Sequence, residues 1–196
     1  MSHGKTLILA SASPRRRELL AMLGVAFEVD VSRFDEASLS HLTDPVEYVR
    51  EAALGKAQEV ASRRAGVILG SDTDVVSPNG VILGKPKNAD EARAMLRSLS
   101  GRTHQVYSAV ALLESDGANI TRQAIEVVET RVTFDTVSDA VINAYVATGD
   151  SLDKAGAYGI QTGGLAFVSR VDGDLSSVIG LPLPTLRRLL AQMSLF

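Results

Sequence analysis

The stretch Leu7-Ile8-Leu9-Ala10-Ser11-Ala12-Ser13-Pro14-Arg15-Arg16-Arg17 joins an apolar run to the start of a helix through a short polar loop. The apolar residues 7–10 predict a buried strand, and the pattern of residues 18–23 predicts an amphipathic helix. Ser13 suits the N-cap of this helix and Pro14 its first position, where a missing N–H is no loss. The stretch therefore predicts a strand, a loop and a helix in direct succession.

Three consecutive arginines, residues 15–17, fall in the first turn of that helix. The N-terminal end of a helix dipole favours negative groups by about 0.3–1 kcal/mol each, so the arginines have the unfavourable sign. A bound anion would remove this conflict, because unpaired backbone N–H groups and guanidinium groups both suit phosphate. The loop is thus a candidate phosphate site. The alternative is that the arginines are simply solvated.

Composition limits the classes of protein to consider. The chain has 196 residues, 45% hydrophobic and 22% charged, which is enough to bury a sizeable core in one domain spanning 1–196. A net charge of −3 gives no general attraction to nucleic acid polymers or anionic membranes, so polyphosphate would need a local positive site. The absence of cysteine excludes disulfides and thiol catalysis. With no secretory signal and no apolar run near the roughly 20 residues of a membrane span, we expect a cytoplasmic protein.

Hydrophobic periodicity predicts alternating strands and helices in the first half of the chain and more hairpins in the second. After the first strand and helix, strands are expected at 26–31, 67–69, 75–76, 81–83, 106–113, 120–134 and 165–168. Further helices are expected after Asp44, Asn88 and Ser138 and over 184–192. This order predicts an α/β protein with a mixed β-sheet flanked by helices.

Asp72 is the strongest candidate for chemistry. It follows the apolar run 67–69, and ligands bind at the carboxyl ends of strands in open α/β sheets. A carboxylate there can hold Mg²⁺ or accept a proton from water, and the alternative is a turn or N-cap aspartate. Asp74 is expected to face solvent at the start of a hairpin strand.

Other charged residues could complete such a site. Asp35 and Glu36 form an acidic pair in a predicted loop, and hard divalent cations prefer carboxylate oxygens. Lys56 lies in the apolar half of a predicted helix, and Lys85 lies between a glycine and a proline. A lysine ammonium is a point charge suited to polyphosphate. The alternatives are a solvated acidic loop and two lysines that extend into water.

The stretch Asp153-Lys154-Ala155-Gly156-Ala157-Tyr158-Gly159-Ile160-Gln161 is also unusual. Its small residues permit close approach of the backbone to a ligand. Lys154 adds positive charge, and the amide of Gln161 can both donate to and accept from a base edge. The alternative is a flexible turn rich in glycine.

Taken together, these stretches resemble the Maf family of nucleoside triphosphate pyrophosphatases. The matching motifs cover nearly the whole chain in order: 11–16, 35–36, 56–57, 70–73, 82–86, 99–104, 153–161 and 180–182. The resemblance implies an elongated α/β protein of the Maf/ITPase type, with two lobes around a central cleft and frequently a homodimer. It implies hydrolysis of a nucleoside triphosphate to the monophosphate and pyrophosphate with Mg²⁺ or Mn²⁺ as cofactor.

The resemblance also implies roles for single residues. Asp72 takes the place of the proposed general base and metal ligand, and Glu36 that of the second acidic group and metal ligand. Lys56 and Lys85 take the places of phosphate-binding lysines in the catalytic set. The residues implied in substrate binding are Ser11, Ser13, Arg15, Arg16, Thr73, Lys154 and Gln161.

Substrate choice within the family follows a few positions. Arg15, Thr73 and Gln161 match the branch that acts on dTTP and UTP, whereas the branch that acts on 7-methyl-GTP carries Asp-Gln where this chain has Asp72-Thr73. One departure is Ser71, because the pyrimidine branch usually has alanine before the aspartate. We therefore expect hydrolysis of dTTP and UTP, with a role in clearing non-standard nucleotides.

Two other functions remain as alternatives. One is the same reaction on another base, such as 7-methyl-GTP. The other is a non-catalytic protein that senses nucleotide or regulates cell division, as the family has been linked to septum formation. Pure anion binding gains nothing from carboxylates beside a phosphate site, and this favours the enzyme.

Overall fold

The computed structural model describes residues 5–195. The chain divides into two compact units, in agreement with the two lobes implied by the resemblance. Unit 1 holds the residues up to Asp72, Ser108–Val128 and the residues from Gly180 onward. Unit 2 holds Thr73–Tyr107 and Glu129–Ile179. No helix among residues 5–195 is long and apolar enough to cross a membrane.

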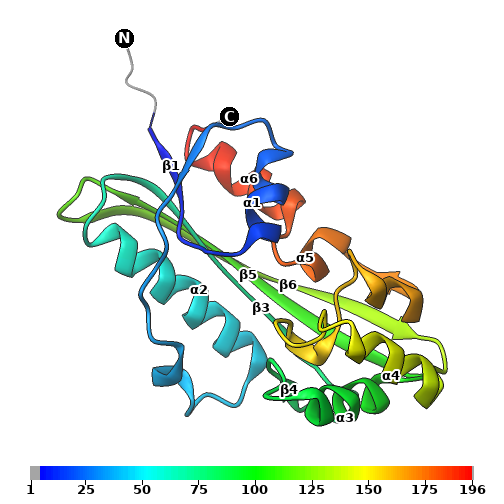
Figure 1. The fold of residues 1–196 in the computed structure, drawn as a ribbon. Coiled ribbons are helices and arrows are strands. Elements are labelled where there is room, and N and C mark those ends of the chain that lie inside the picture. Colours follow the sequence, from blue (N-terminus) through cyan, green and yellow to red (C-terminus); the bar gives the residue numbers. More distant parts are fainter. Residues whose placement is uncertain (1–4, 196) are drawn as a thin grey trace. The chain divides into compact units, whose positions relative to one another are not determined.

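The strands form one mixed sheet, as predicted, in the order β2-β1-β3-β5-β6-β7 (Figure 1). The parallel part consists of β1 (Leu7–Leu9), paired with β2 (Phe27–Val29) and with β3 (Gly66–Val76). Two antiparallel pairs join β4 (Ile82–Leu83) to β3 and β7 (Val168–Asp172) to β6. The long strands β5 (Thr103–Ser115) and β6 (Ile120–Phe134) are neighbours, as expected for the two predicted over 106–113 and 120–134.

The first four α-helices begin where the sequence predicts them, the last begins one residue earlier than expected, and the short helix over 175–179 was not predicted. The α-helices are α1 (Pro14–Ala21), α2 (Pro45–Ala61), α3 (Ala89–Leu99), α4 (Asp139–Ala147), α5 (Leu175–Ile179) and α6 (Leu183–Gln192). Three short 3₁₀-helices are η1 (Glu36–Leu39), η2 (Ala155–Ala157) and η3 (Gly163–Phe167). The side chains of Ser13, Asp44, Asn88 and Ser138 all accept hydrogen bonds from N–H groups of the helices that follow them, which confirms four predicted N-caps.

The predicted strand over 165–168 is wrong. Residues Gly163–Phe167 form η3, and β7 begins only at Val168. Gly164 packs so closely on the backbone of Gly159 that a Cβ there would lie 2.7 Å from the Gly159 carbonyl oxygen. This contact curls the chain, so that Phe167 is buried while the apolar Leu165 is exposed.

The predicted end of the third strand was also wrong. Strand β3 continues past Leu69 to Val76, so Asp72 lies within the strand and not beyond it. Asp74 is buried, contrary to the expectation that it faces solvent. The strand continues because Val75 and Val76 pair with β4 and are buried, and this pairing carries the polar residues before them into the interior.

The core of unit 2 contains an aromatic cluster of edge-to-face pairs. His104 contacts both Phe134 and Tyr158, and Phe167 contacts Phe134 and Tyr145. Nε2 of His104 lies 2.8 Å from the Tyr158 hydroxyl, while the buried Nδ1 has no hydrogen-bond partner. Burial lowers the pKa of His104 to about 4, so the ring is neutral at pH 7.

This histidine predicts a loss of stability in mild acid. The pKa of His104 is lower in the folded chain than the ordinary value of 6.5, so the unfolded chain binds the proton first. We expect the free energy of unfolding to fall by roughly 2–3 kcal/mol from this group between pH 7.5 and 4.5. Urea denaturation across this range should show a shallower pH dependence in His104→Gln than in the exposed control His41→Gln. Equal pH dependence in the two variants would contradict the assignment.

Candidate active site

The polar loop before α1 is held as a turn by its own serines. The Ser13 hydroxyl accepts a hydrogen bond from the Arg16 N–H at 3.4 Å, and Ser11 Oγ accepts one from the Ser13 N–H at 3.2 Å. The Arg16 guanidinium donates to Ser11 Oγ at 3.3 Å. No acidic residue lies in the first turn of α1. The structure therefore brings Ser11, Ser13 and Arg16 together, with Arg15 half-buried beside them in the sequence.

The carbonyl of Gly180 links this turn to strand β3. It accepts a hydrogen bond from Arg16 Nε at 3.0 Å and another from the buried Ser71 hydroxyl at 3.3 Å. We call residues 11–16 the arginine turn. Because Ser71 directly precedes Asp72, the Gly180 carbonyl connects the arginine turn with the segment of β3 that carries the predicted base. Sequence reasoning missed this role, although Gly180 begins one of the motifs behind the family resemblance.

Lys56 brings two predicted carboxylates together within unit 1. Its Nζ lies 2.6 Å from Oδ1 of Asp72 and 2.9 Å from Oε1 of Glu36. The side chains of Lys56 and Asp72 are only 11% and 9% exposed, whereas that of Glu36 is 51% exposed. We call Glu36, Lys56 and Asp72 the carboxylate–lysine cluster. Its two carboxylates and one ammonium leave a local formal charge of −1 beside a cationic turn.

Gly70 makes this geometry possible. A Cβ at Gly70 would lie 2.1 Å from the Ala53 carbonyl oxygen and 2.9 Å from the Ala57 Cβ, so α2 lies directly against β3 (Figure 1). Side chains two residues apart on a strand point to the same face, which places Asp72 on the face that α2 covers. The close approach of the helix therefore lets Lys56 reach Asp72.

Glu36 reaches the cluster because its segment packs on α2. A Cβ at Gly55 would fall 2.5 Å from the Phe34 ring, so the ring packs directly against the helix at a glycine. Asp35 caps η1, since its Oδ1 accepts from the Ala37 N–H at 3.0 Å. The predicted acidic pair thus has two roles: Asp35 shapes the turn, and Glu36 contacts Lys56.

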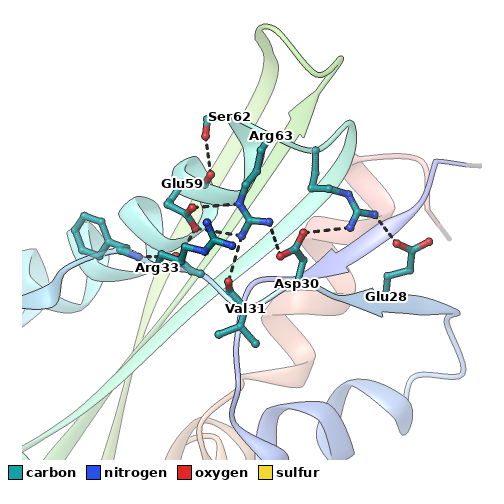
Figure 2. A network of polar contacts seen from close by, with 10 residues as sticks. Glu28, Asp30, Val31, Arg33, Glu59, Ser62 and Arg63 are labelled. Atoms are coloured by element: carbon teal, nitrogen blue, oxygen red, sulfur yellow. Dashed lines mark hydrogen bonds and ion pairs between the residues drawn. The ribbon is translucent and has the colours of Figure 1, made fainter.

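Polar contacts at the other end of α2 anchor the chain that leads to Glu36 (Figure 2). The Arg63 guanidinium donates to Asp30 at 2.5 Å, to Glu59 at 3.2 Å and to the Val31 carbonyl at 3.1 Å. The Arg33 N–H donates to Glu59 at 2.9 Å. Hydrogen bonding by Arg63 holds the pKa of Asp30 below its usual range. These contacts restrain residues 30–33, just before the segment that packs on α2.

The remaining predicted residues belong to unit 2. Thr73 is half-buried in β3, Lys85 is exposed after β4, and Gln161 is exposed in the glycine-rich loop. Lys154 is largely buried, and its ammonium contacts three acceptors of its own loop: the Asp150 carbonyl at 2.6 Å, the Asp150 carboxylate at 2.9 Å and the Asp153 carboxylate at 2.6 Å. An ammonium has three N–H donors, so these contacts use its full capacity.

Among residues 5–195, no three side chains of His, Asp or Glu gather in a way that could hold a metal ion. The cluster supplies two carboxylates, whose oxygens converge on the single positive charge of Lys56. Mg²⁺ typically uses one or two protein carboxylates together with water and substrate phosphates. The donors present therefore fit a divalent cation of this kind without a third protein ligand.

The fold and this cluster define an α/β protein with an arginine turn suited to anions and two carboxylates that share one lysine. The chain belongs to the Maf family: the family model described as Maf-like protein matches residues 6–193.

Relatives named dTTP/UTP pyrophosphatase match this chain over nearly its full length. The protein from Clostridium novyi is 44% identical over 189 residues, covering 95% of this chain and 97% of the relative. That from Moorella thermoacetica is 47% identical over 186 residues, covering 94% and 93%, and that from Bacillus cereus is 43% identical over 192 residues, covering 97% and 91%. A solved nucleoside-triphosphatase / dITP/XTP pyrophosphatase from Mycobacterium abscessus has a TM-score of 0.41 and 17% identity, covering 67% of this chain and 75% of that one.

Proposed function

We propose that this chain is a nucleoside triphosphate pyrophosphatase that hydrolyses dTTP and UTP to the monophosphate and pyrophosphate. The relatives named for this activity support the reaction class and the bases. The observation that carries the proposal is the carboxylate–lysine cluster. The charged groups of Lys56 and the buried Asp72 are 2.6 Å apart, and Asp72 follows a serine that shares the Gly180 carbonyl with the arginine turn. A buried ion pair of this kind adds little net stability, and charged groups brought together in this way mark a candidate functional site.

The arginine turn is assigned to the triphosphate. A nucleoside triphosphate is a multiply charged anion, and a chain of net charge −3 must bind it through local positive groups. Arg15 and Arg16 provide guanidinium groups at a helix N-terminus, where backbone N–H groups also suit phosphate. Ser11 and Ser13 hold the turn and are assigned to the same phosphates. Lys85 remains a predicted phosphate ligand.

We further propose Mg²⁺ or Mn²⁺ as cofactor, held by Asp72 and Glu36. Such an ion, when bound, polarises a phosphate oxygen and increases the acidity of a bound water. The oxygen-only donor pair and its convergence on one charge support this assignment.

The remaining steps belong to the chain's own residues. Asp72 accepts a proton from the water that attacks the α-phosphorus in line. The bond from the α-phosphorus to the bridging oxygen breaks, and pyrophosphate leaves with that oxygen. Lys56 holds the Asp72 carboxylate in place and offers positive charge to the developing negative charge on the phosphate oxygens. Thr73 and the Gln161 amide are proposed to contact the base.

The test is a pyrophosphate-release assay with dTTP, UTP, CTP, GTP and 7-methyl-GTP, with and without Mn²⁺. We expect turnover of dTTP and UTP that exceeds the others by at least about tenfold in kcat/KM and disappears with chelator. Preference for 7-methyl-GTP would overturn the substrate assignment and keep the reaction class. Binding without turnover of any nucleotide would instead favour the nucleotide sensor. A homodimer and a cytoplasmic location remain expectations, and sedimentation analysis tests the first.

A further inference from the structure

Asp150 gathers three donors around one carboxylate in unit 2. Its Oδ2 accepts hydrogen bonds from the Tyr145 hydroxyl at 2.6 Å and the Thr162 hydroxyl at 2.5 Å. Its Oδ1 accepts one from the Lys154 ammonium at 2.9 Å. Burial raises the pKa of Asp150, but the bonds from Thr162, Tyr145 and Lys154 outweigh it and hold the pKa below the ordinary value. The Asp150 carboxylate is therefore ionised at neutral pH and binds all three donors.

Two of these donors, Tyr145 and Thr162, connect Asp150 to the two ends of the turn 159–162. The Tyr145 hydroxyl, which donates to Asp150, also accepts a hydrogen bond from the Gly159 N–H at 3.0 Å. The Thr162 N–H donates to the Gly159 carbonyl at 3.1 Å, which closes a turn over Ile160 and Gln161. Both ends of the turn, Gly159 and Thr162, are thus connected to the same carboxylate.

The side chains inside the turn have opposite environments. Ile160 is 6% exposed and packs in the core cluster of unit 2, whereas Gln161 is exposed. Gly159 is closely enclosed by this network, because a Cβ there would lie 2.6 Å from both the Lys154 side chain and the Thr162 hydroxyl. With one residue buried and both ends anchored, the backbone of Gln161 has little freedom to move.

We propose that Asp150 is a positioning residue for base selection, which fixes the turn 159–162 so that Gln161 presents its amide to the nucleobase in one orientation. This rests on the proposed function, in which Gln161 contacts the base. Lys154 then acts mainly as a cationic partner of Asp150, since its three donors are used within its own loop. An amide whose orientation is fixed before binding discriminates base edges more effectively, because ordering it on binding costs free energy.

The test compares Asp150→Asn with the wild type on dTTP, UTP and CTP, and uses inorganic tripolyphosphate as a competitive inhibitor that lacks a base. We expect the KM for dTTP and UTP to rise about tenfold, kcat to change less than threefold, and the preference for UTP over CTP to shrink. The Ki of tripolyphosphate should stay within twofold, because the turn contacts the base and not the phosphates. Asp139→Asn, an exposed aspartate on α4 paired with Arg97, is the matched control and should behave as wild type.

A second variant covers the case in which Asp150→Asn does not fold. Thr162→Val removes one hydroxyl at an exposed residue, and we expect a smaller rise in KM with the same loss of selectivity. In Asp150→Glu, the retained charge should restore part of the selectivity. Unchanged KM and selectivity in folded Asp150→Asn, or an equal rise in the tripolyphosphate Ki, would overturn the proposal. Absence of dTTP turnover in the wild type would instead refute the proposed function. Turnover by the wild type is therefore measured before that of any variant.

Discussion

The substitution Asp72→Asn is expected to lower kcat for dTTP hydrolysis by about 10³-fold or more, in line with loss of a general base. Asparagine has nearly the same shape, but its amide cannot accept the proton of the attacking water and is a poorer ligand for a divalent cation. Nucleotide binding should persist, because the phosphates are assigned to the arginine turn. Pyrophosphate release measures kcat, and titration calorimetry with dTTP measures the Kd, which should stay within about fivefold.

The cluster itself explains why this variant should fold. Removing one partner of a buried ion pair is usually costly, since the other charge is left unpaired. Here Lys56 keeps Glu36 at 2.9 Å, so the ammonium retains a carboxylate partner. The matched control is Asp90→Asn, an aspartate that is 95% exposed and forms an ion pair with its helix neighbour Arg93. Turnover of Asp72→Asn within tenfold of this control would refute the role of Asp72 as base.

The second large effect is expected from Gly70→Ala, which should reduce the free energy of unfolding by about 3 kcal/mol or more. The added methyl would lie 2.1 Å from the Ala53 carbonyl oxygen, and a Cβ cannot rotate away from a backbone atom. Helix α2 must therefore move off β3, which also lengthens the distance from Lys56 to Asp72. Urea denaturation measures the stability, and pyrophosphate release by the folded fraction measures the loss of activity.

Gly84→Ala is the matched control for stability. A Cβ at Gly84 would meet nothing within 4 Å, and its backbone is outside the left-handed region. Its free energy of unfolding should differ from wild type by less than about 0.5 kcal/mol. If Gly70→Ala proved as stable as Gly84→Ala, the close approach of α2 to β3 would not be what positions the cluster.

Local features were predictable because their causes are local. Ser13 and Asn88 cap their helices through hydrogen bonds to N–H groups three residues away, and the residue types signal this directly. The prediction of a strand over 165–168 was wrong because an apolar run does not reveal that Gly164 packs on the backbone of Gly159. The prediction that Asp74 faces solvent was wrong for a related reason, because its burial depends on the pairing of Val75 and Val76 with β4.

The residues of the candidate site also fall into those that the sequence predicted and those that it did not. Asp72, Lys56 and Glu36 were each singled out by residue type and by motifs, and the structure places both carboxylates within 3 Å of the Lys56 ammonium. No pattern along the chain signalled the Gly180 carbonyl as a link, because a backbone acceptor has no sequence signature. Asp150 was missed because its role arises from side chains up to twelve residues away that meet only in the folded loop.

The sequence alone determined most of the order of strands and helices, four N-caps and the chemical types available for the site, because these follow from short-range periodicity and hydrogen bonding. Only the tertiary structure decided which carboxylates share Lys56, how closely α2 lies on β3 at Gly70, and which groups Asp150 anchors. Those outcomes depend on contacts between residues distant in the chain. Packing sets the distances between these groups. Two charged groups interact strongly only within a few ångströms, and beyond that distance each is solvated separately.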